Sequence, residues 1–253
     1  MSNETASAPV EAIPEVESSV PAYRHRGIQY LTFFKRLAEI AQPASYLEIG
    51  TRDGSSLATI GCDAICVDPI MRPKPVALDR GRTFCFQMSS DRFFHETDVF
   101  TIFPRGVDLA FLDGMHRFEY LLRDFINIEP YCHSRSLVIV HDCFPSRVDL
   151  AGRVSQGGAW AGDVWKLVPI LKELRPELTL SRIDCPPTGL LAIQDLSADS
   201  PVLSEGYQGV VRKYGELSLD EYGLERLWTE VEVIESRKLV DDESLWSLRL
   251  PNF

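Results

Sequence analysis

Between residues 45 and 140 the chain alternates short, almost continuously apolar runs with amphipathic stretches, and no other feature limits its possible folds so strongly. Apolar runs of this length are typical of strands that are buried on both faces of a parallel sheet. The amphipathic stretches, of which Phe118–Ile128 is the clearest, have the spacing of helices. The pattern therefore predicts an α/β fold with right-handed crossovers and helices on both faces of the sheet. The predicted strands are Tyr46–Ile49, Ala64–Val67, Phe84–Met88, Val107–Leu112 and Leu137–Val140.

Two further apolar runs close this region in a different way. Leu178–Ile183 and Leu190–Ile193 are separated only by residues 184–189, which include two prolines and a glycine. A link this short suits an antiparallel hairpin, because a parallel crossover needs a dozen or more residues. We therefore expect a mostly parallel sheet that ends in an antiparallel hairpin.

The flanking segments differ in composition from this core. Residues 1–20 hold four glutamates and no basic residue, so we expect a disordered tail. A helix is predicted over Ile28–Ile40, and residues 21–195 are predicted to form one domain. Two more helices, Val202–Tyr214 and Leu219–Lys238, would make 196–253 a helical extension that packs on the core or forms a contact in a homo-oligomer.

Charge and cysteine content limit the partners and the compartment. The net charge of −11 disfavours nucleic acid and anionic membrane surfaces as partners. The six cysteines include no C-x-x-C pair, and several lie in apolar runs, so we expect reduced thiols and a cytoplasmic protein. No apolar stretch approaches the roughly 20 residues that span a bilayer.

A glycine-containing turn follows the first predicted strand, in the run E-I-G-T-R-D-G-S-S over residues 48–56. Gly50 and Gly54 permit a tight turn and a close backbone approach to a ligand. The run lacks the G-x-G-x-x-G fingerprint, which argues against an oxidoreductase that uses a nicotinamide dinucleotide. The Glu48 carboxylate would repel a pyrophosphate but suits a ligand that carries a sulfonium and an ammonium group.

Polar residues also follow the second and third strands. Asp68 is placed to accept the hydroxyls of a ribose, and Ser89, Ser90 and Asp91 could read the edge of an adenine. Each residue has a plainer interpretation as well: Asp68 or Asp91 as a helix cap, and the glycines as a simple turn. Their order along three successive strands favours a cofactor site.

A third set of residues lies where the fourth and fifth strands end. Because the carboxyl ends of parallel strands meet at one edge of a sheet, Asp113 and Asp142 should face the same pocket. Two carboxylates suit Mg²⁺ or a similar hard cation, and His116 has the pKa of a general base at neutral pH. Asp113 before Gly114 is also ordinary turn chemistry, and a histidine in a loop is often merely solvated.

Two motifs in the sequence resemble those of a known protein family. The run Y-L-E-I-G-x-x-x-G-x-S over residues 46–56 resembles motif I of the class I, Rossmann-like S-adenosylmethionine-dependent methyltransferases. The run D-L-A-F-L-D-G-M-H-R-F-E over 108–119, followed by His141-Asp142, resembles the macrocin-type branch of natural-product and sugar O-methyltransferases, and 162–167 is similar to a helix start in that branch. The likeness covers about residues 44–195 and implies a seven-stranded sheet whose last strand is antiparallel.

The resemblance also implies roles for individual residues. S-adenosylmethionine would contact Glu48, Gly50, Gly54, Ser55, Asp68, Ser89, Ser90, Asp91 and Asp113. His116 and Asp113 would be catalytic in methylating a hydroxyl of a small molecule such as a sugar or a glycosylated natural product. Asp113, His141 and Asp142 would hold a metal ion.

His141 stands where relatives have an acid, and imidazole is a poor ligand for Mg²⁺. Either the metal is softer, such as Mn²⁺, or His141 orients the substrate, or no metal binds. An alternative function is a non-catalytic protein that binds the cofactor or serves assembly. The tryptophans Trp160, Trp165 and Trp228 are expected in the core.

Overall fold

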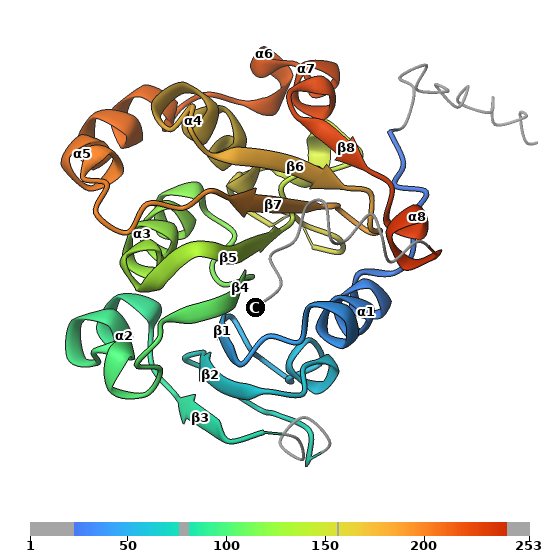
Figure 1. Ribbon diagram of the computed structural model, residues 1–253. Helices are drawn as coiled ribbons and strands as arrows, with labels where there is room; N and C mark the ends of the chain where they lie inside the picture. The colour runs from blue at the N-terminus through green and yellow to red at the C-terminus, as the bar shows by residue number, and fades with distance from the viewer. Residues whose placement is uncertain (1–22, 76–80, 156, 242–253) are drawn as a thin grey trace, which may run out of the picture.

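A computed structural model describes residues 23–75, 81–155 and 157–241, so the predicted tail 1–20 lies outside the described residues. Within them a single sheet has the strand order β3-β2-β1-β4-β5-β7-β6-β8 (Figure 1). All seven predicted strands are present, and an eighth lies at one edge. The strands are β1 (Ser45–Ile49), β2 (Asp63–Val67), β3 (Thr83–Phe86), β4 (Val107–Leu112), β5 (Cys132–His141), β6 (Thr179–Ile183), β7 (Leu190–Gln194) and β8 (Glu232–Ile234).

The strand directions agree with the sequence. β1, β2, β3, β4 and β5 pair in parallel with one another. β7 runs antiparallel to both β5 and β6, which confirms the predicted hairpin and the antiparallel last strand of the seven. The carboxyl ends of β1, β2, β4 and β5 therefore lie at one edge of the sheet, where the sequence places its polar residues.

The single helix predicted over Leu219–Lys238 is wrong. The chain forms α6 (Leu219–Tyr222), α7 (Leu224–Thr229), β8 and α8 (Ser236–Asp241) in its place. Gly223 has a φ of 97°, which interrupts the helix. β8 then pairs in parallel with β6 and adds an edge to the sheet, so the β-branched residues after Thr229 form a strand.

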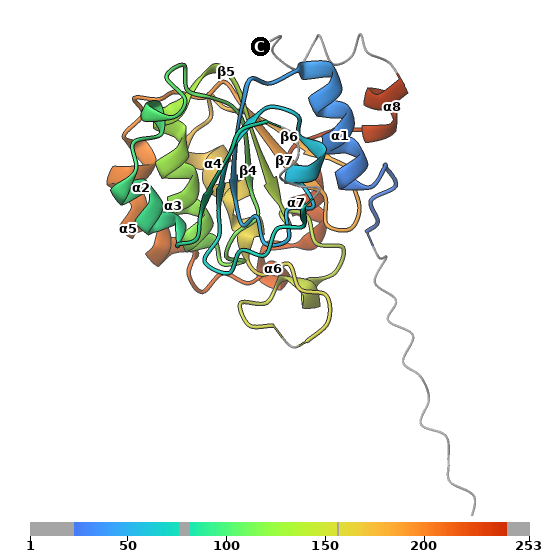
Figure 2. The same cartoon turned by 90° about the horizontal axis from the view of Figure 1, so that it is seen from below.

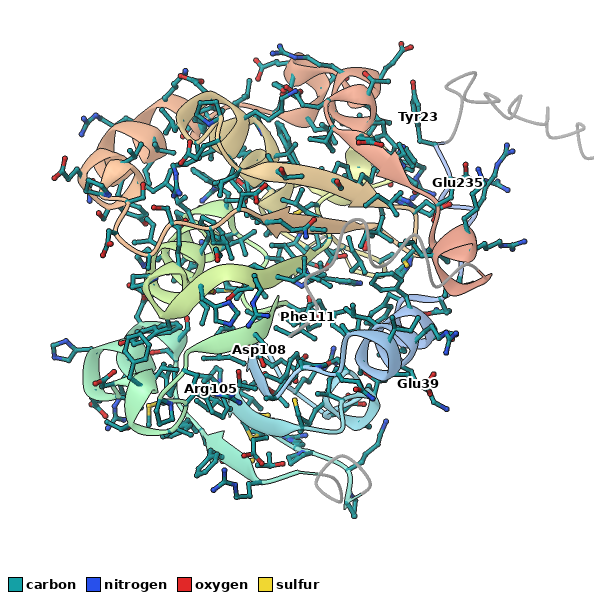
Figure 3. All side chains as sticks on the ribbon, in the orientation of Figure 1. Tyr23, Glu39, Arg105, Asp108, Phe111 and Glu235 are labelled. Atoms are coloured by element: carbon teal, nitrogen blue, oxygen red, sulfur yellow. The ribbon has the colours of Figure 1, made fainter. Side chains whose placement is uncertain are left out.

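Helices cover the two faces of the sheet (Figure 2). α1 (Tyr30–Ala41) and α8 lie on one face. On that face the Phe34 and Phe111 rings meet with centroids 4.6 Å apart, and Phe111 is labelled on β4 in Figure 3. The opposite face carries a second and larger apolar core. Its helices are α2 (Ser90–Glu96), α3 (Phe118–Ile128), α4 (Leu167–Leu174) and α5 (Val202–Tyr214).

The approach to α1 is tied to the last strands of the sheet. The Gly27 N–H donates to the carbonyl of Asp184 at 3.1 Å. The Ile28 N–H donates to the Ser236 hydroxyl at 2.9 Å, and the Ser236 N–H donates to the Asp184 carboxylate at 2.7 Å. A Cβ at Gly27 would lie 1.9 Å from Ser236 Oγ, so only glycine fits at this crossing.

The six cysteines are all free. Among the described residues, no helix has both the length and the apolar character needed to cross a membrane.

Candidate functional site

A cavity of about 1220 Å³ lies at the carboxyl ends of β1, β2, β3, β4 and β5. Most of the residues predicted from the sequence line it, although they come from five separate strand ends. Two predicted residues, Glu48 and Gly54, do not line it. The predicted residues that do are Gly50, Ser55, Asp68, Ser89, Ser90, Asp91, Asp113, His116, His141 and Asp142.

The turn after β1 lies close to the ends of β2 and β4. Gly50 has a φ of 92°, and a Cβ there would lie 2.0 Å from the carbonyl oxygen of Asp113. The Gly50 N–H donates to the Val67 carbonyl at 2.8 Å, and the Asp113 N–H donates to that of Ile49 at 2.9 Å. The end of β1 can therefore approach the ends of β2 and β4 only with glycine at this position.

Glu48 lies one layer behind the cavity wall. Its side chain is fully buried and accepts a hydrogen bond from the hydroxyl of Ser56, which does line the cavity. Oε2 of Glu48 has no hydrogen-bond partner among the described residues. Burial, opposed by the bond from Ser56, raises the pKa of Glu48 to about 8. At neutral pH the group is therefore largely protonated, where a carboxylate was expected, and its contact with the cofactor stays a prediction.

Asp68 lines the cavity and also organises the adjoining loops. Its Oδ2 accepts a 2.8 Å hydrogen bond from the Arg52 N–H, and its Oδ1 accepts a 2.6 Å bond from the Ile70 N–H. The carboxylate is thus oriented by the backbone at the end of β2, where a ribose was predicted. Asp68 caps no helix that the structure describes, and its contact with a ribose stays a prediction.

The three predicted residues after β3 make different contacts. Ser89 caps α2 by accepting a 3.4 Å bond from the Arg92 N–H. Both oxygens of Asp91 are occupied by Arg123, at 2.8 Å each, and this ion pair lowers the pKa of Asp91. Burial raises the pKa of the Asp124 carboxyl on α3 to about 7, an effect that the nearby Ser90 side chain opposes.

Four side chains converge where β4 and β5 end. Nδ1 of His141 lies 3.4 Å from Oδ1 of Asp113 and 3.1 Å from Oδ2 of Asp142. Nε2 of His116 lies 3.5 Å and 3.2 Å from the same two oxygens. Burial opposes a charge on His141, but the two carboxylates outweigh it and raise the pKa of His141 to about 10.

The chemistry of this cluster fits a divalent cation. Neither ring nitrogen of His141 has a hydrogen-bond partner among the described residues, although both are buried. One ligand atom each from Asp113, His141 and Asp142 lie within 4.8 Å of one another. Ligands that bind a metal at about 2.0–2.2 Å lie about 3–3.5 Å from each other, and the two separations between His141 and the carboxylates, 3.4 Å and 3.1 Å, fall in this range. Three of the predicted residues thus form a plausible ligand set.

Asp142 is held in an unusual backbone conformation. Its φ is 63°, in the left-handed region that aspartate tolerates better than most residues. Its Oδ1 accepts a 2.6 Å hydrogen bond from the hydroxyl of Thr188 in the β6–β7 hairpin. Such strain is characteristic of functional sites when neighbouring contacts maintain it.

His116 is oriented by the segment that follows β5. Its Nδ1 lies 3.2 Å from the carbonyl oxygen of Trp160, which can only accept, so Nδ1 carries a proton. Burial lowers the pKa of His116, but the Asp113 and Asp142 carboxylates beside Nε2 outweigh it and raise that pKa. A Cβ at Gly162 would lie 1.9 Å from the His116 carbonyl oxygen. Trp160 is half-buried against His116, with ring centroids 5.2 Å apart, whereas Trp165 and Trp228 are buried in the core as predicted.

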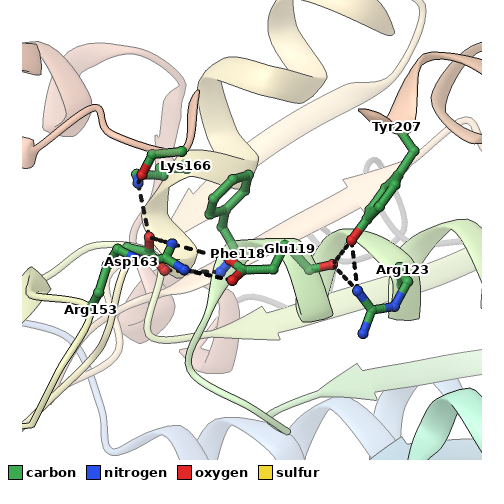
Figure 4. Close-up of polar contacts among 8 residues, drawn as sticks. Phe118, Glu119, Arg123, Arg153, Asp163, Lys166 and Tyr207 are labelled. Carbon is green, nitrogen blue, oxygen red and sulfur yellow. Dashed lines mark hydrogen bonds and ion pairs between the residues drawn. The ribbon is translucent and has the colours of Figure 1, made fainter. Parts of the chain in front are cut away.

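An ion-pair network anchors this segment to α3 (Figure 4). Arg153 contacts Glu119 at 2.6 Å and Asp163 at 2.5 Å. Asp163 also accepts from the Phe118 N–H at 3.0 Å and from Lys166 at 2.9 Å. Sequence reasoning missed this network, because no spacing links its members.

Tyr30 was also missed. It is the first residue of α1, it lines the cavity, and its ring centroid lies 4.7 Å from that of His141. Its only signal in the sequence was its place at the start of a predicted helix.

Comparison with known proteins agrees with this geometry. Residues 47–143 match the family model described as "Methyltransferase domain". The chain shares 13% identity and a TM-score of 0.50 with the Podospora anserina methyltransferase PaMTH1 bound to S-adenosylhomocysteine, covering 66% of this chain and 78% of that one. No curated protein matches the chain.

Two other solved structures are similar to the same degree. One is a putative O-methyltransferase from Klebsiella pneumoniae, at 14% identity, and the other is the O-methyltransferase TomG from Streptomyces achromogenes in complex with S-adenosylmethionine, at 13%. Each has a TM-score of 0.50, with 66% of this chain and 80% of that chain covered. The likeness in structure shows the fold, and the family model matches residues 47–143 alone.

Proposed function

We propose that this chain, whose residues 47–143 match a methyltransferase domain, transfers a methyl group from S-adenosylmethionine to a hydroxyl of a small molecule. The observation that carries the proposal is the convergence of Asp113, His116, His141 and Asp142 on one wall of a large cavity. An alcohol is a weak nucleophile and a weak acid, so its methylation needs a base or a cation close to the reacting oxygen.

The cofactor is assigned to the β1–β2 side of the cavity. Gly50 and Ser55 lie in the turn after β1, and Asp68 presents a carboxylate at the end of β2 for a ribose. Bound there, S-adenosylmethionine supplies an electrophilic methyl group. The cavity of about 1220 Å³ exceeds the usual range for one small ligand, so it has room for an acceptor as well.

Asp113, His141 and Asp142 are assigned as ligands of a divalent cation. The mixture of two carboxylates and one imidazole suits Mn²⁺ better than Mg²⁺. A cation at this position would stabilise negative charge on an acceptor oxygen. His116 stands outside the three-residue ligand set, and its Nε2 is assigned to accept the proton of the acceptor hydroxyl.

The acceptor is proposed to be small and polar, such as a sugar or a glycosylated natural product. The net charge of −11 disfavours a nucleic acid as the acceptor. Free cysteines suit the reducing cytoplasm, where we place the protein.

Calorimetric titration tests the proposal. The purified protein is titrated with S-adenosylmethionine and S-adenosylhomocysteine, with Mn²⁺, with Mg²⁺ and with EDTA, and is then screened for transfer of a labelled methyl group to sugars and glycosides. Micromolar cofactor binding and metal-dependent transfer are expected. Asp113→Ala should abolish transfer, and Asp149→Asn, a change in an exposed ion pair, should not. Absence of cofactor binding under every condition would refute the proposal.

A further inference from the structure

The carbonyl group that orients His116 belongs to a segment without regular structure. Nδ1 of His116 lies 3.2 Å from the carbonyl oxygen of Trp160. Trp160 lies between two short 3-10 helices, Val148–Ala151 and Val164–Lys166, and no described residue of the 152–163 loop that joins them is in a helix or strand. Because neither a helix nor a sheet fixes the backbone of this loop, other contacts must hold the carbonyl in place.

Two hydrogen bonds join the arms of the loop to each other. The Ala161 N–H donates to the Leu150 carbonyl at 2.9 Å. Nε1 of Trp160 donates to the Gly152 carbonyl at 2.6 Å. Neither bond reaches α3, the helix that begins two residues after His116. A different contact must therefore fix the position of the closed loop relative to His116.

Arg153 makes such a contact, as Figure 4 shows. Its Nη2 lies 2.6 Å from Oε1 of Glu119, in the first turn of α3, and its Nη1 lies 2.5 Å from Oδ2 of Asp163, at the end of the loop. Its guanidinium carbon also lies 5.7 Å from the ring centroid of Phe118. A planar guanidinium donates to two carboxylates in fixed directions, whereas a lysine ammonium is a point charge. Arg153 thus joins the loop to the helix start beside His116.

Arg153 can be replaced without leaving a buried charge unpaired. Asp163 keeps two other donors, the Phe118 N–H at 3.0 Å and Lys166 at 2.9 Å. The Glu119 side chain is 17% exposed and that of Arg153 is 38% exposed, so water can hydrate the carboxylate that Arg153 releases. The fold should therefore tolerate loss of Arg153 better than loss of Asp163 or Lys166, whose side chains are 2% and 1% exposed.

We propose that Arg153 is a positioning residue for His116. By fastening the loop to α3, Arg153 holds the Trp160 carbonyl against Nδ1 of His116 and keeps Nε2 facing the two carboxylates of the candidate ligand set. Without this attachment the carbonyl can move away, and the imidazole can turn from the position that a proton transfer requires. The inference rests on the proposed function, which assigns the proton of the acceptor hydroxyl to Nε2.

A positioning role predicts an effect on the rate of methyl transfer and little effect on binding. The cofactor is assigned to the β1–β2 side of the cavity, and no described residue of the loop lines the cavity. Loss of Arg153 should therefore leave cofactor binding nearly unchanged. It should lower kcat on the order of 10- to 100-fold, because misplacing a catalytic group by about 1 Å can cost this much.

NMR spectra of the histidines test the position of the ring directly. The full-length protein, labelled with nitrogen-15 at its five histidines, is compared with Arg153→Met, Arg153→Lys and Arg147→Met. His116→Gln identifies the His116 signals by their loss. Arg147 forms an exposed ion pair with Asp149 in the same connection between β5 and α4, so Arg147→Met is the matched control.

The Nδ1–H of His116 should exchange with water about tenfold faster in Arg153→Met than in the unaltered protein, as expected for the loss of one hydrogen bond. Arg153→Lys, which keeps the charge without the fork, should lie between the two, and it is the second variant should Arg153→Met fail to fold.

Steady-state kinetics with the acceptor found by the methyl-transfer screen measure the consequence. Arg153→Met should lower kcat, while KM and the Kd of S-adenosylhomocysteine change less than about twofold. In the His116→Gln background it should have no further effect on kcat, because Arg153 acts through His116. Arg147→Met should match the unaltered protein in every measurement.

Unchanged exchange of the Nδ1–H in Arg153→Met overturns the inference and leaves the proposed function standing. An unchanged kcat, or a loss of kcat that adds to that of His116→Gln, does the same. Weaker binding of S-adenosylhomocysteine together with altered signals of all five histidines would show a general structural role and also overturns it. If the unaltered protein binds no cofactor and transfers no methyl group, the proposed function fails, and the exchange measurement alone decides whether Arg153 positions His116.

Discussion

The Thr188 hydroxyl donates a 2.6 Å hydrogen bond to Oδ1 of Asp142. Thr188 belongs to the turn of the β6–β7 hairpin, and Asp142 follows β5. The hairpin therefore also supports the candidate metal site, by holding a carboxylate of the candidate ligand set whose backbone has a φ of 63°.

Removing this hydroxyl should weaken metal binding. In Thr188→Val we expect the affinity for Mn²⁺ to fall on the order of tenfold, because residues that orient metal ligands typically contribute that much. Thr188→Ser keeps the hydroxyl and serves as the control. Titration of Mn²⁺ followed by electron paramagnetic resonance measures the effect, and equal affinities in the two variants would contradict the assigned role.

His116→Gln should impair chemistry more than binding. Its Nε2 is assigned to accept a proton, and such a group typically contributes on the order of 10²–10⁴-fold to the rate. We expect kcat for the identified acceptor to fall by this order, with S-adenosylhomocysteine binding nearly unchanged. His95→Gln, at an exposed position on α2, is the matched control. Full activity of His116→Gln would mean that another group takes the proton.

Glu48 should make the protein less stable as the pH rises. Burial raises its pKa in the folded protein from 4.5 to about 8, so the folded state binds the proton more tightly than the unfolded state does. The contribution is fully present below about pH 4.5 and is lost progressively as the pH approaches 8, at up to about 1.4 kcal/mol per pH unit.

Thermal unfolding of the unaltered protein and of Glu48→Gln across this range isolates the effect, since the amide cannot titrate. The Tm of the unaltered protein should fall relative to that of Glu48→Gln between pH 5 and about pH 8. A constant difference across the range would show that Glu48 is ionised in the folded state.

Gly162→Ala should displace His116 and destabilise the fold. The residue has a φ of 69°, and a Cβ would lie 1.9 Å from the His116 carbonyl oxygen. We expect a loss of more than about 1 kcal/mol in the free energy of unfolding, measured with urea, together with reduced methyl transfer. Gly209→Ala is the control, because its Cβ meets nothing within 4 Å on α5 and should stabilise the helix by about 0.5–1 kcal/mol.

The sequence predicted the parallel core well because its signal is local. Strands buried on both faces are continuous apolar runs, and the run over Val107–Leu112 coincides with β4. The helix prediction over Leu219–Lys238 also rested on a local signal, and it was wrong. The apolar spacing of this segment resembles a helix, while the strand within it depends on pairing with β6, a partner about 50 residues earlier in the chain.

The meeting of the site residues that lie at strand ends could be predicted from the sequence. Asp113, His141 and Asp142 follow two strands that adjoin in the sheet, so their meeting required only the sheet order. The engagement of Asp91 by Arg123 was not predictable, since it depends on how α2 packs on α3. For the same reason Tyr30 and Arg153, whose importance comes from packing, carry no recognisable motif.

The crossing of Gly27 with Asp184 and Ser236 has a consequence for the order in which the protein forms during synthesis. Residues near Gly27 are synthesised before the groups that hold them, which belong to the turn after β6 and to α8. Strands β1 to β5 could assemble on the nascent chain before Gly27 and Ile28 had these partners. The side of the cavity next to α1 would then be held in place only after Ser236, about 50 residues beyond Asp184, had been made.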